Sequence, residues 1–119
     1  MNSIEISVRF LKFGAKIIRM TKTLDKSASS RIILRQIIRS GCSAGANYQE
    51  AVAAQSKADF IHKTQIVLKE LRETHYWLQL IEESTLLIRE EIDIKVISKE
   101  NIELIKIMSK TVITAKSKL

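Results

Sequence analysis

The sequence contains no proline and only three glycines among its 119 residues. Both residue types interrupt helices, so their scarcity leaves room for long helical segments. No apolar run approaches the roughly 18 residues that a membrane-spanning helix needs, and we expect no membrane association. The length suits one domain with one core, so the sequence predicts an all-α protein with a single domain over residues 1–119.

Cysteine is almost absent as well. Cys42 is the single cysteine, which excludes an internal disulfide and makes a reducing compartment the simplest location. The first residues, Met1 to Glu5, lack the basic segment and apolar block of a signal peptide. We therefore expect a cytoplasmic protein.

Positive charge exceeds negative charge, and the excess is uneven. The net charge is +7, and residues 1–60 hold ten Lys and Arg against four Asp and Glu. Such an excess in one half indicates an anionic partner, either RNA or DNA, although a solvated basic face is the alternative. The candidate nucleic-acid-binding residues lie in two rows: Arg9, Lys12, Lys16 and Arg19, then Arg31, Arg35 and Arg39.

Aromatic residues make up only 5% of the chain. Few rings are therefore available for base stacking, and binding would be directed at the phosphate backbone with low sequence specificity. Within the second basic row, Arg35 and Arg39 could instead serve a polar cluster on the same segment.

Apolar residues recur at steps of three and four, which predicts helices at about 3–23, 27–54, 57–83 and 89–116. Ser27 or Ser29 would cap the second helix and Ser56 the third. Short loops between such helices predict an antiparallel up-down-up-down four-helix bundle. The buried faces are predicted, helix by helix, to include Ile4, Val8, Leu11, Ala15 and Ile18; Ile33, Ile37, Ala44, Tyr48 and Ala51; Phe60, Val67, Leu71 and Leu78; Ile92, Val96, Leu104, Met108 and Val112.

The third helix carries a second apolar stripe about 100° from its core stripe. It contains Ile66, Leu80 and the only tryptophan, Trp77. A monomeric bundle needs one stripe per helix, and tryptophan is enriched at interfaces. These residues therefore predict an oligomer interface, with a wide core face as the alternative.

Two glycines stand in the apolar sector of the second helix, Gly41 and Gly45. Each costs about 1 kcal/mol against alanine in a helix interior, so we expect a neighbouring helix to approach closely there. Polar residues accompany them on an adjacent stripe and on the third helix. They predict a partly buried polar network of Asn47, Glu50, Lys69, Glu70 and Glu73.

Catalytic and metal-binding patterns are scarce. A di-iron bundle needs Glu-x-x-His pairs on two helices, whereas Asp59 and His62 form the only acid–histidine pair at that spacing. Cys42 lies among small residues, which indicates packing rather than a nucleophile. No glycine-rich phosphate loop, zinc spacing or Ser-His-Asp order is present. We expect a non-enzymatic protein without a cofactor or metal.

The middle of the chain resembles the bacterial 23S rRNA intervening-sequence protein family, also called the four-helix-bundle protein family. The matching residues are Arg39-Ser40, Ser43, Gly45-Ala46-Asn47-Tyr48, Glu50-Ala51, Ser56 to Lys63, Lys69-Glu70, Glu73-Thr74, Tyr76-Trp77-Leu78 and Lys110 to Lys116. The resemblance implies up-down-up-down bundles assembled as a ring of five subunits. It also implies kinship with accessory proteins of diversity-generating retroelements, which bind nucleic acid and a reverse transcriptase, and it supplies no catalytic residues.

Two functions follow as hypotheses. The first is an oligomeric protein that binds nucleic acid through its basic surface. The second is a protein–protein scaffold or accessory subunit with no nucleic-acid role, in which the basic face is incidental.

Overall fold

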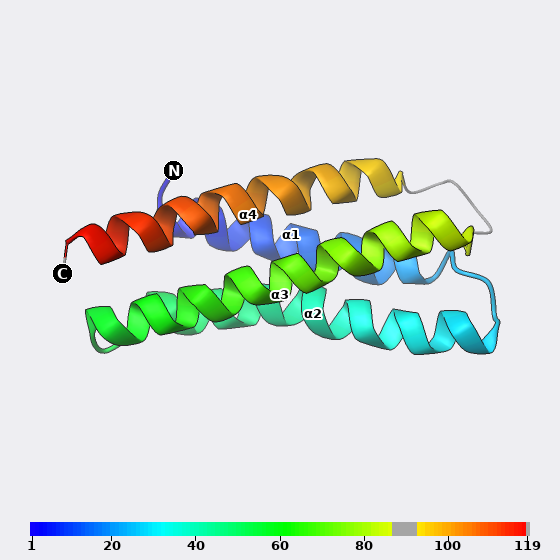
Figure 1. The fold of residues 1–119 in the computed structure, drawn as a ribbon, viewed down its shortest axis with the longest axis horizontal. Helices are drawn as coiled ribbons and strands as arrows, with labels where there is room; N and C mark the ends of the chain where they lie inside the picture. Colours follow the sequence, from blue (N-terminus) through cyan, green and yellow to red (C-terminus); the bar gives the residue numbers. More distant parts are fainter. Residues whose placement is uncertain (87–92, 119) are drawn as a thin grey trace.

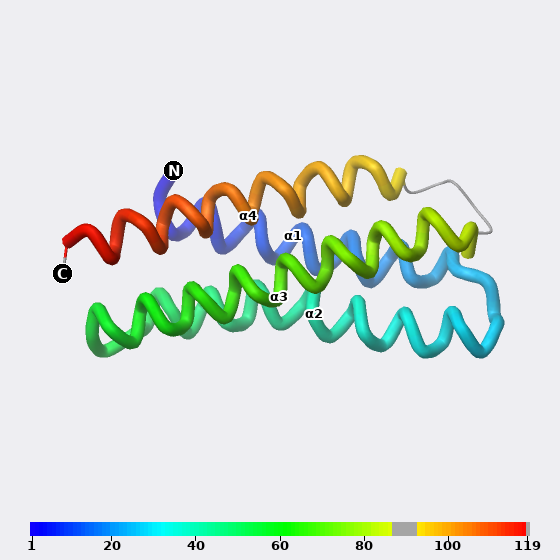
Figure 2. Tube along the Cα trace, viewed as in Figure 1, coloured from blue at the N-terminus to red at the C-terminus, as the bar shows by residue number. Residues whose placement is uncertain are grey.

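The computed structural model describes residues 1–86 and 93–118, and these residues form helices without a strand. Successive helices run in opposite directions along an elongated bundle of 48 × 24 × 20 Å (Figures 1 and 2). The all-α class is confirmed, while residues 89–92 of the fourth predicted helix lie outside the described residues. The helices are α1 (Ser3–Thr21), α2 (Ala28–Val52), α3 (Lys57–Ser84) and α4 (Ile94–Ser117).

Each helix begins at a side-chain cap. The capping oxygen accepts a hydrogen bond from a backbone N–H of the first turn, which satisfies a donor that has no partner inside the helix. Ser27 accepts from the Ser30 N–H and Ser56 from the Asp59 N–H, both at 3.1 Å. The predicted caps of α2 and α3 are confirmed, with Ser27 rather than Ser29 at the start of α2.

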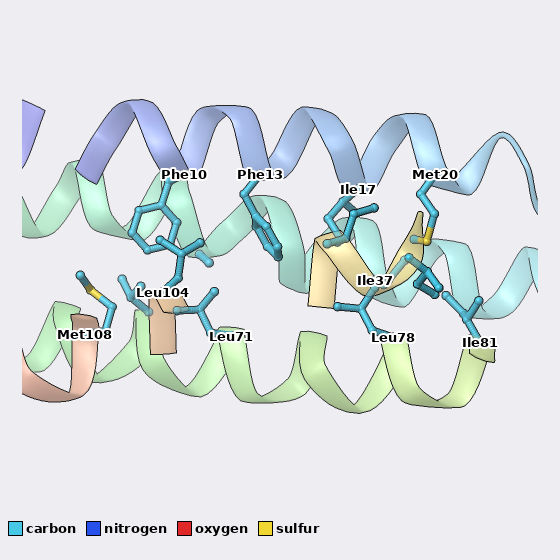
Figure 3. Close-up of a cluster of buried hydrophobic side chains, with 14 of the residues drawn as sticks. Phe10, Phe13, Ile17, Met20, Ile37, Leu71, Leu78, Ile81, Leu104 and Met108 are labelled. Carbon is cyan, nitrogen blue, oxygen red and sulfur yellow. The ribbon is translucent and has the colours of Figure 1, made fainter. Parts of the chain in front are cut away.

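The core lies along the bundle axis. In Figure 3, Phe10, Phe13, Ile17 and Met20 of α1 point toward the side chains of α3. The predicted core faces of α2 and α3 are largely confirmed. Their buried members are Ile37, Ala44, Tyr48, Ala51, Val67, Leu71 and Leu78, whereas Ile33 and Phe60 are only partly buried.

The predicted core face of α1 is wrong. Ile4 and Leu11 are 75% and 76% exposed, and Val8 and Ile18 are exposed as well. The buried stripe lies on the opposite side of the helix and contains both phenylalanines. Both stripes follow the helical period, so periodicity could not choose between them. The contacts of α1 with the neighbouring helices determine which of the two stripes is buried.

On α4, the prediction for Val96 is wrong, since this side chain is 52% exposed. Its neighbour Ile97 is buried instead and continues the stripe of Leu104, Met108 and Val112, which are buried as predicted. One residue along a helix turns the side chain by about 100°, enough to move Val96 from the core to solvent. Ile92 lies outside the described residues.

The glycines of α2 allow α1 to come close, as predicted. A Cβ added at Gly41 would lie 3.1 Å from Ile17 Cγ1, and one at Gly45 would lie 3.1 Å from Phe10 Cβ. Both are tighter than ordinary van der Waals contact. α2 and α3 share the most extensive packing in the bundle, and α1 and α4 share the least among the four adjacent pairs of helices.

Candidate functional site

A polar cluster joins α2 to α3 on one side of the bundle. Arg39 bridges two carboxylates: its Nη1 lies 3.2 Å from Glu70 Oε2, and its Nη2 contacts Glu73. Ser43 Oγ donates to Glu70 at 2.9 Å, and Trp77 Nε1 donates to Glu73 at 2.9 Å. We call these five residues the Arg39 cluster. The Glu70 side chain is only 17% exposed, so the cluster is partly screened from water.

The predicted polar network is brought together only in part. Glu70 and Glu73 share Arg39, but the Asn47 amide donates to the carbonyl of Ser43 on its own helix. Glu50 pairs instead with Lys63 at 3.3 Å, and Lys69 is exposed. Within one chain, Asn47, Glu50 and Lys69 therefore lie outside the cluster. The sequence signal for its true members was the spacing of Arg39 to Ser43 and of Glu73 to Trp77, four residues in each case.

The predicted interface residues share a face of α3 with the Arg39 cluster, and one of them, Trp77, belongs to it. Ile66, Trp77 and Leu80 are partly buried, and Trp77 packs against the hydrophobic core while its indole N–H bonds Glu73. Tyr76 is exposed next to it, with the two rings 5.2 Å apart edge to face. An interface on this face stays a prediction, and the described chain gives it an aromatic and acidic character.

The basic residues divide into paired and unpaired ones. Arg9 Nε donates to Glu100 at 3.0 Å, and a second guanidinium N–H binds the same carboxylate. This hydrogen bonding raises the pKa of Arg9 and joins α1 to α4. Arg39 is held in its cluster. Among the described residues, no carboxylate pairs with the other candidates, which are Lys12, Lys16, Arg19, Arg31 and Arg35.

Sequence reasoning missed a third row of cations, on α4. Lys95, Lys99, Lys106 and Lys110 are exposed and fall within about 60° of one another on the helix. Of the ion pairs among described residues, one involves this row, a 3.8 Å contact between Lys106 and Glu103. This row was missed because charge was summed over the second half of the chain, where the carboxylates of α3 offset these lysines. The signal that could have found the row is the spacing of its lysines, which are four, seven and four residues apart and so share one helix face.

The exposed apolar stripe of α1 continues onto α2. A groove of about 410 Å³ runs between the helices, with Leu11, Ala15 and Ile18 on the α1 side. Gly14 and Gly45 lie on its floor because they carry no side chain to fill it. We call this surface the α1–α2 apolar face. Apolar patches of this kind on a folded domain commonly mark interaction sites.

A second hollow, of about 730 Å³, opens at the end of the bundle where α1 and α3 begin and α4 ends. Its apolar lining includes Ile6, Phe60 and Ile107. Its polar residues include lysines from two helices and from the chain end, Lys57, Lys110 and Lys118. Three cations therefore line this hollow.

Groups with catalytic potential lie apart. Cys42 Sγ would be 3.8 Å from a Cβ at Gly14, so the thiol faces α1, whereas both histidines are on α3. Burial raises the pKa of Cys42, which keeps the thiol protonated and weakly nucleophilic. Among the described residues, no group of three or more His, Cys, Asp and Glu side chains is placed to hold a metal ion. Nor is any described helix long and apolar enough to cross a membrane.

The comparisons with known proteins agree with this architecture. The family model of the 23S rRNA-intervening sequence protein matches residues 3–110. The chain belongs to this family. The chain is also similar to a crystal structure from Bacteroides thetaiotaomicron, described as a protein of unknown function from the S23 ribosomal protein family. The two are 36% identical with a TM-score of 0.83, over 94% of this chain and 98% of the other. No curated protein matches the sequence.

Proposed function

We propose that this protein is a non-enzymatic, self-associating helical bundle that binds nucleic acid through phosphate contacts with low sequence specificity. The observation that carries the proposal is the set of exposed cations on α1 and α2 that no described carboxylate neutralises. Lys12 and Arg19 on α1 and Arg31 and Arg35 on α2 are its exposed members. Such cations bind phosphates and release counterions, which is the main source of non-specific affinity.

Low specificity follows from the scarcity of exposed rings. Within the described residues, Tyr76 is the one aromatic side chain that is exposed, and it lies on α3 rather than beside the basic rows. Base stacking therefore has little to act on. Contacts to phosphates position a protein on nucleic acid without reading its sequence.

Self-association as a ring, five-membered as in the family resemblance, is part of the proposal. A ring needs two different faces per subunit, because each subunit presents one face to each neighbour. The α1–α2 apolar face and the face with Trp77 are two such faces, since the first lies between α1 and α2 and the second on α3. Leu11 on the first face is exposed and Trp77 on the second is partly exposed, which supports a contact between these two faces of neighbouring subunits.

The absence of enzymatic activity is also proposed, and it is supported by the separation of Cys42 from the histidines. A cytoplasmic location is supported by the single cysteine. A reverse transcriptase partner rests on the family resemblance alone.

A second candidate function, a protein scaffold without a nucleic-acid role, is favoured by the α1–α2 apolar face. A face this apolar suits a protein partner better than a phosphate backbone. Under this alternative the basic rows only keep the protein soluble.

Nucleic-acid retardation separates the two candidates. We expect the wild type to retard RNA or DNA at about 50 mM salt, with affinity that falls steeply as salt rises, by a log–log slope of about −0.9 per phosphate on duplex DNA. Replacing Lys12, Lys16 and Arg19 with glutamate should abolish binding, with circular dichroism showing the fold intact. If the wild type retards neither RNA nor DNA, nucleic-acid binding is rejected and the protein scaffold becomes the proposed function.

A further inference from the structure

The hollow of about 730 Å³ lies at the end of the bundle that α1 does not reach. α1 begins inside this end, whereas the start of α3 and the end of α4 project beyond it (Figure 1). The projecting turns of α3 and α4 therefore have no α1 residues packed over them. The volume of the hollow is within the range of about 300–1,000 Å³ that is typical of small-molecule sites.

The floor of the hollow is apolar. Ile6 of α1, Phe60 of α3 and Ile107 of α4 line it, so three helices contribute to the same surface. Ile6 is only 8% exposed, whereas Phe60 and Ile107 are partly exposed through the hollow. Apolar surface that stays in contact with water favours a ligand with an apolar body, because binding removes that surface from water.

The rim of the hollow is positively charged. Lys57 at the start of α3 and Lys110 and Lys118 near the end of α4 are exposed. Lys57 Nζ donates to the Lys118 carbonyl at 3.1 Å, and its other ammonium hydrogens remain for a ligand. Asp59 and Glu5 neighbour lining residues in the sequence, but no described aspartate or glutamate lines the hollow. An anion at the rim therefore meets cations without a competing carboxylate.

We infer that this hollow binds a small anionic amphiphile, with an aliphatic body on the apolar floor and a carboxylate or phosphate head at the lysine rim. Ser56 and Thr114 line the same hollow, and their hydroxyl groups supply further hydrogen-bond donors for the head. Apolar walls with a few polar groups that orient the ligand are the usual composition of a small-molecule site. The inference does not depend on nucleic-acid binding.

NMR of the isoleucine methyl groups tests the site in the full chain. The methyls of Ile6 and Ile107 report on the hollow, and those of Ile37 and Ile97, buried elsewhere in the core, serve as references. Octanoate and octyl phosphate should shift the Ile6 and Ile107 methyls in a saturable way. Each should bind at least about threefold more tightly than neutral 1-octanol, the gain expected from an exposed ion pair. Binding of only one of the two anions would identify the head group.

Two lysine variants test the rim. Lys110→Gln with Lys118→Gln removes two rim cations, and the matched control, Lys95→Gln with Lys99→Gln, removes the same charge from exposed positions at the other end of α4. The rim variant should bind octanoate about three- to tenfold more weakly, and the control should bind as the wild type does.

The floor is tested by Ala115→Phe, which places a ring in the hollow without changing its charge. This variant should lose the methyl shifts at Ile6 and Ile107, with circular dichroism showing that the helices are intact. The inference is overturned if wild-type methyls in the hollow do not shift, if 1-octanol binds as tightly as octanoate, if both lysine variants weaken binding equally, or if folded Ala115→Phe still binds. All four outcomes leave the proposed function standing.

Discussion

At the residue scale, the contribution of Arg39 to stability comes from its guanidinium, which lies between the carboxylates of Glu70 and Glu73. Exposed ion pairs usually contribute little, because water and salt screen them. Here one arginine separates two carboxylates that also accept hydrogen bonds from Ser43 and Trp77. Removing the arginine would leave Glu70 and Glu73 facing each other, and Glu70 is largely shielded from water.

We therefore expect Arg39→Ala to lower the free energy of unfolding by about 1 kcal/mol, a value kept modest because Arg39 is half exposed. In a double-mutant cycle with Glu70→Ala, the coupling should exceed about 0.5 kcal/mol. Urea denaturation followed by circular dichroism measures it. The matched cycle of Glu50→Ala with Lys69→Ala should be additive, since these residues do not share a partner. If the losses from Arg39→Ala and Glu70→Ala were additive, the coupling free energy between the two residues would be zero and the cluster would not stabilise the fold.

A second residue-scale prediction concerns pH. Hydrogen bonds from Ser27 and Ser30 lower the pKa of Asp25 at the start of α2. A carboxylate with a lowered pKa stabilises the fold above its unfolded pKa of about 3.9, and the contribution is lost as pH falls through the folded pKa. Asp25→Asn should therefore lower Tm at pH 7, with the difference from wild type closing below about pH 4. A difference that persists at pH 2 would exclude ionisation as its cause.

At the element scale, helix positions could be predicted from the sequence more readily than helix faces. Proline scarcity, apolar spacing and the caps at Ser27 and Ser56 gave boundaries within about two residues wherever the structure describes them. The buried face of α1 could not be predicted, because two stripes share one period and the contacts with Gly41 and Gly45 select between them. The α4 lysines were missed because net charge averages over helices that face different ways.

The neighbours Val96 and Ile97 give a direct test of the α4 face. Ile97→Ala should lower the free energy of unfolding by about 2–5 kcal/mol, because it leaves a cavity in the core. Val96→Ala should change it by no more than about 0.5 kcal/mol, since the side chain is 52% exposed. Chemical denaturation of the two variants measures both values. Equal losses would place the core stripe elsewhere on α4.

At the scale of the whole molecule, the proposed assembly depends on two surfaces of the bundle. The α1–α2 apolar face lies between α1 and α2, and the face with Trp77 lies on α3. If they bind each other, the contact joins two different surfaces of neighbouring subunits. Such a contact builds a closed ring when the rotation between subunits closes, and a filament when it does not. This distinction is accessible in solution, because the two faces can be damaged separately.

Light scattering at micromolar concentration should give a single species of about five times the 13.6 kDa chain mass. Leu11→Glu damages the α1–α2 apolar face by placing a charge in an apolar contact, and Trp77→Ala damages the other face by truncating a side chain typical of interface hot spots. Each variant alone should be monomeric. An equimolar mixture should give dimers and no larger species, because each pair retains one intact face from each partner. A two-fold symmetric contact would not be restored by mixing, and a wild type that stays monomeric would end the assembly proposal.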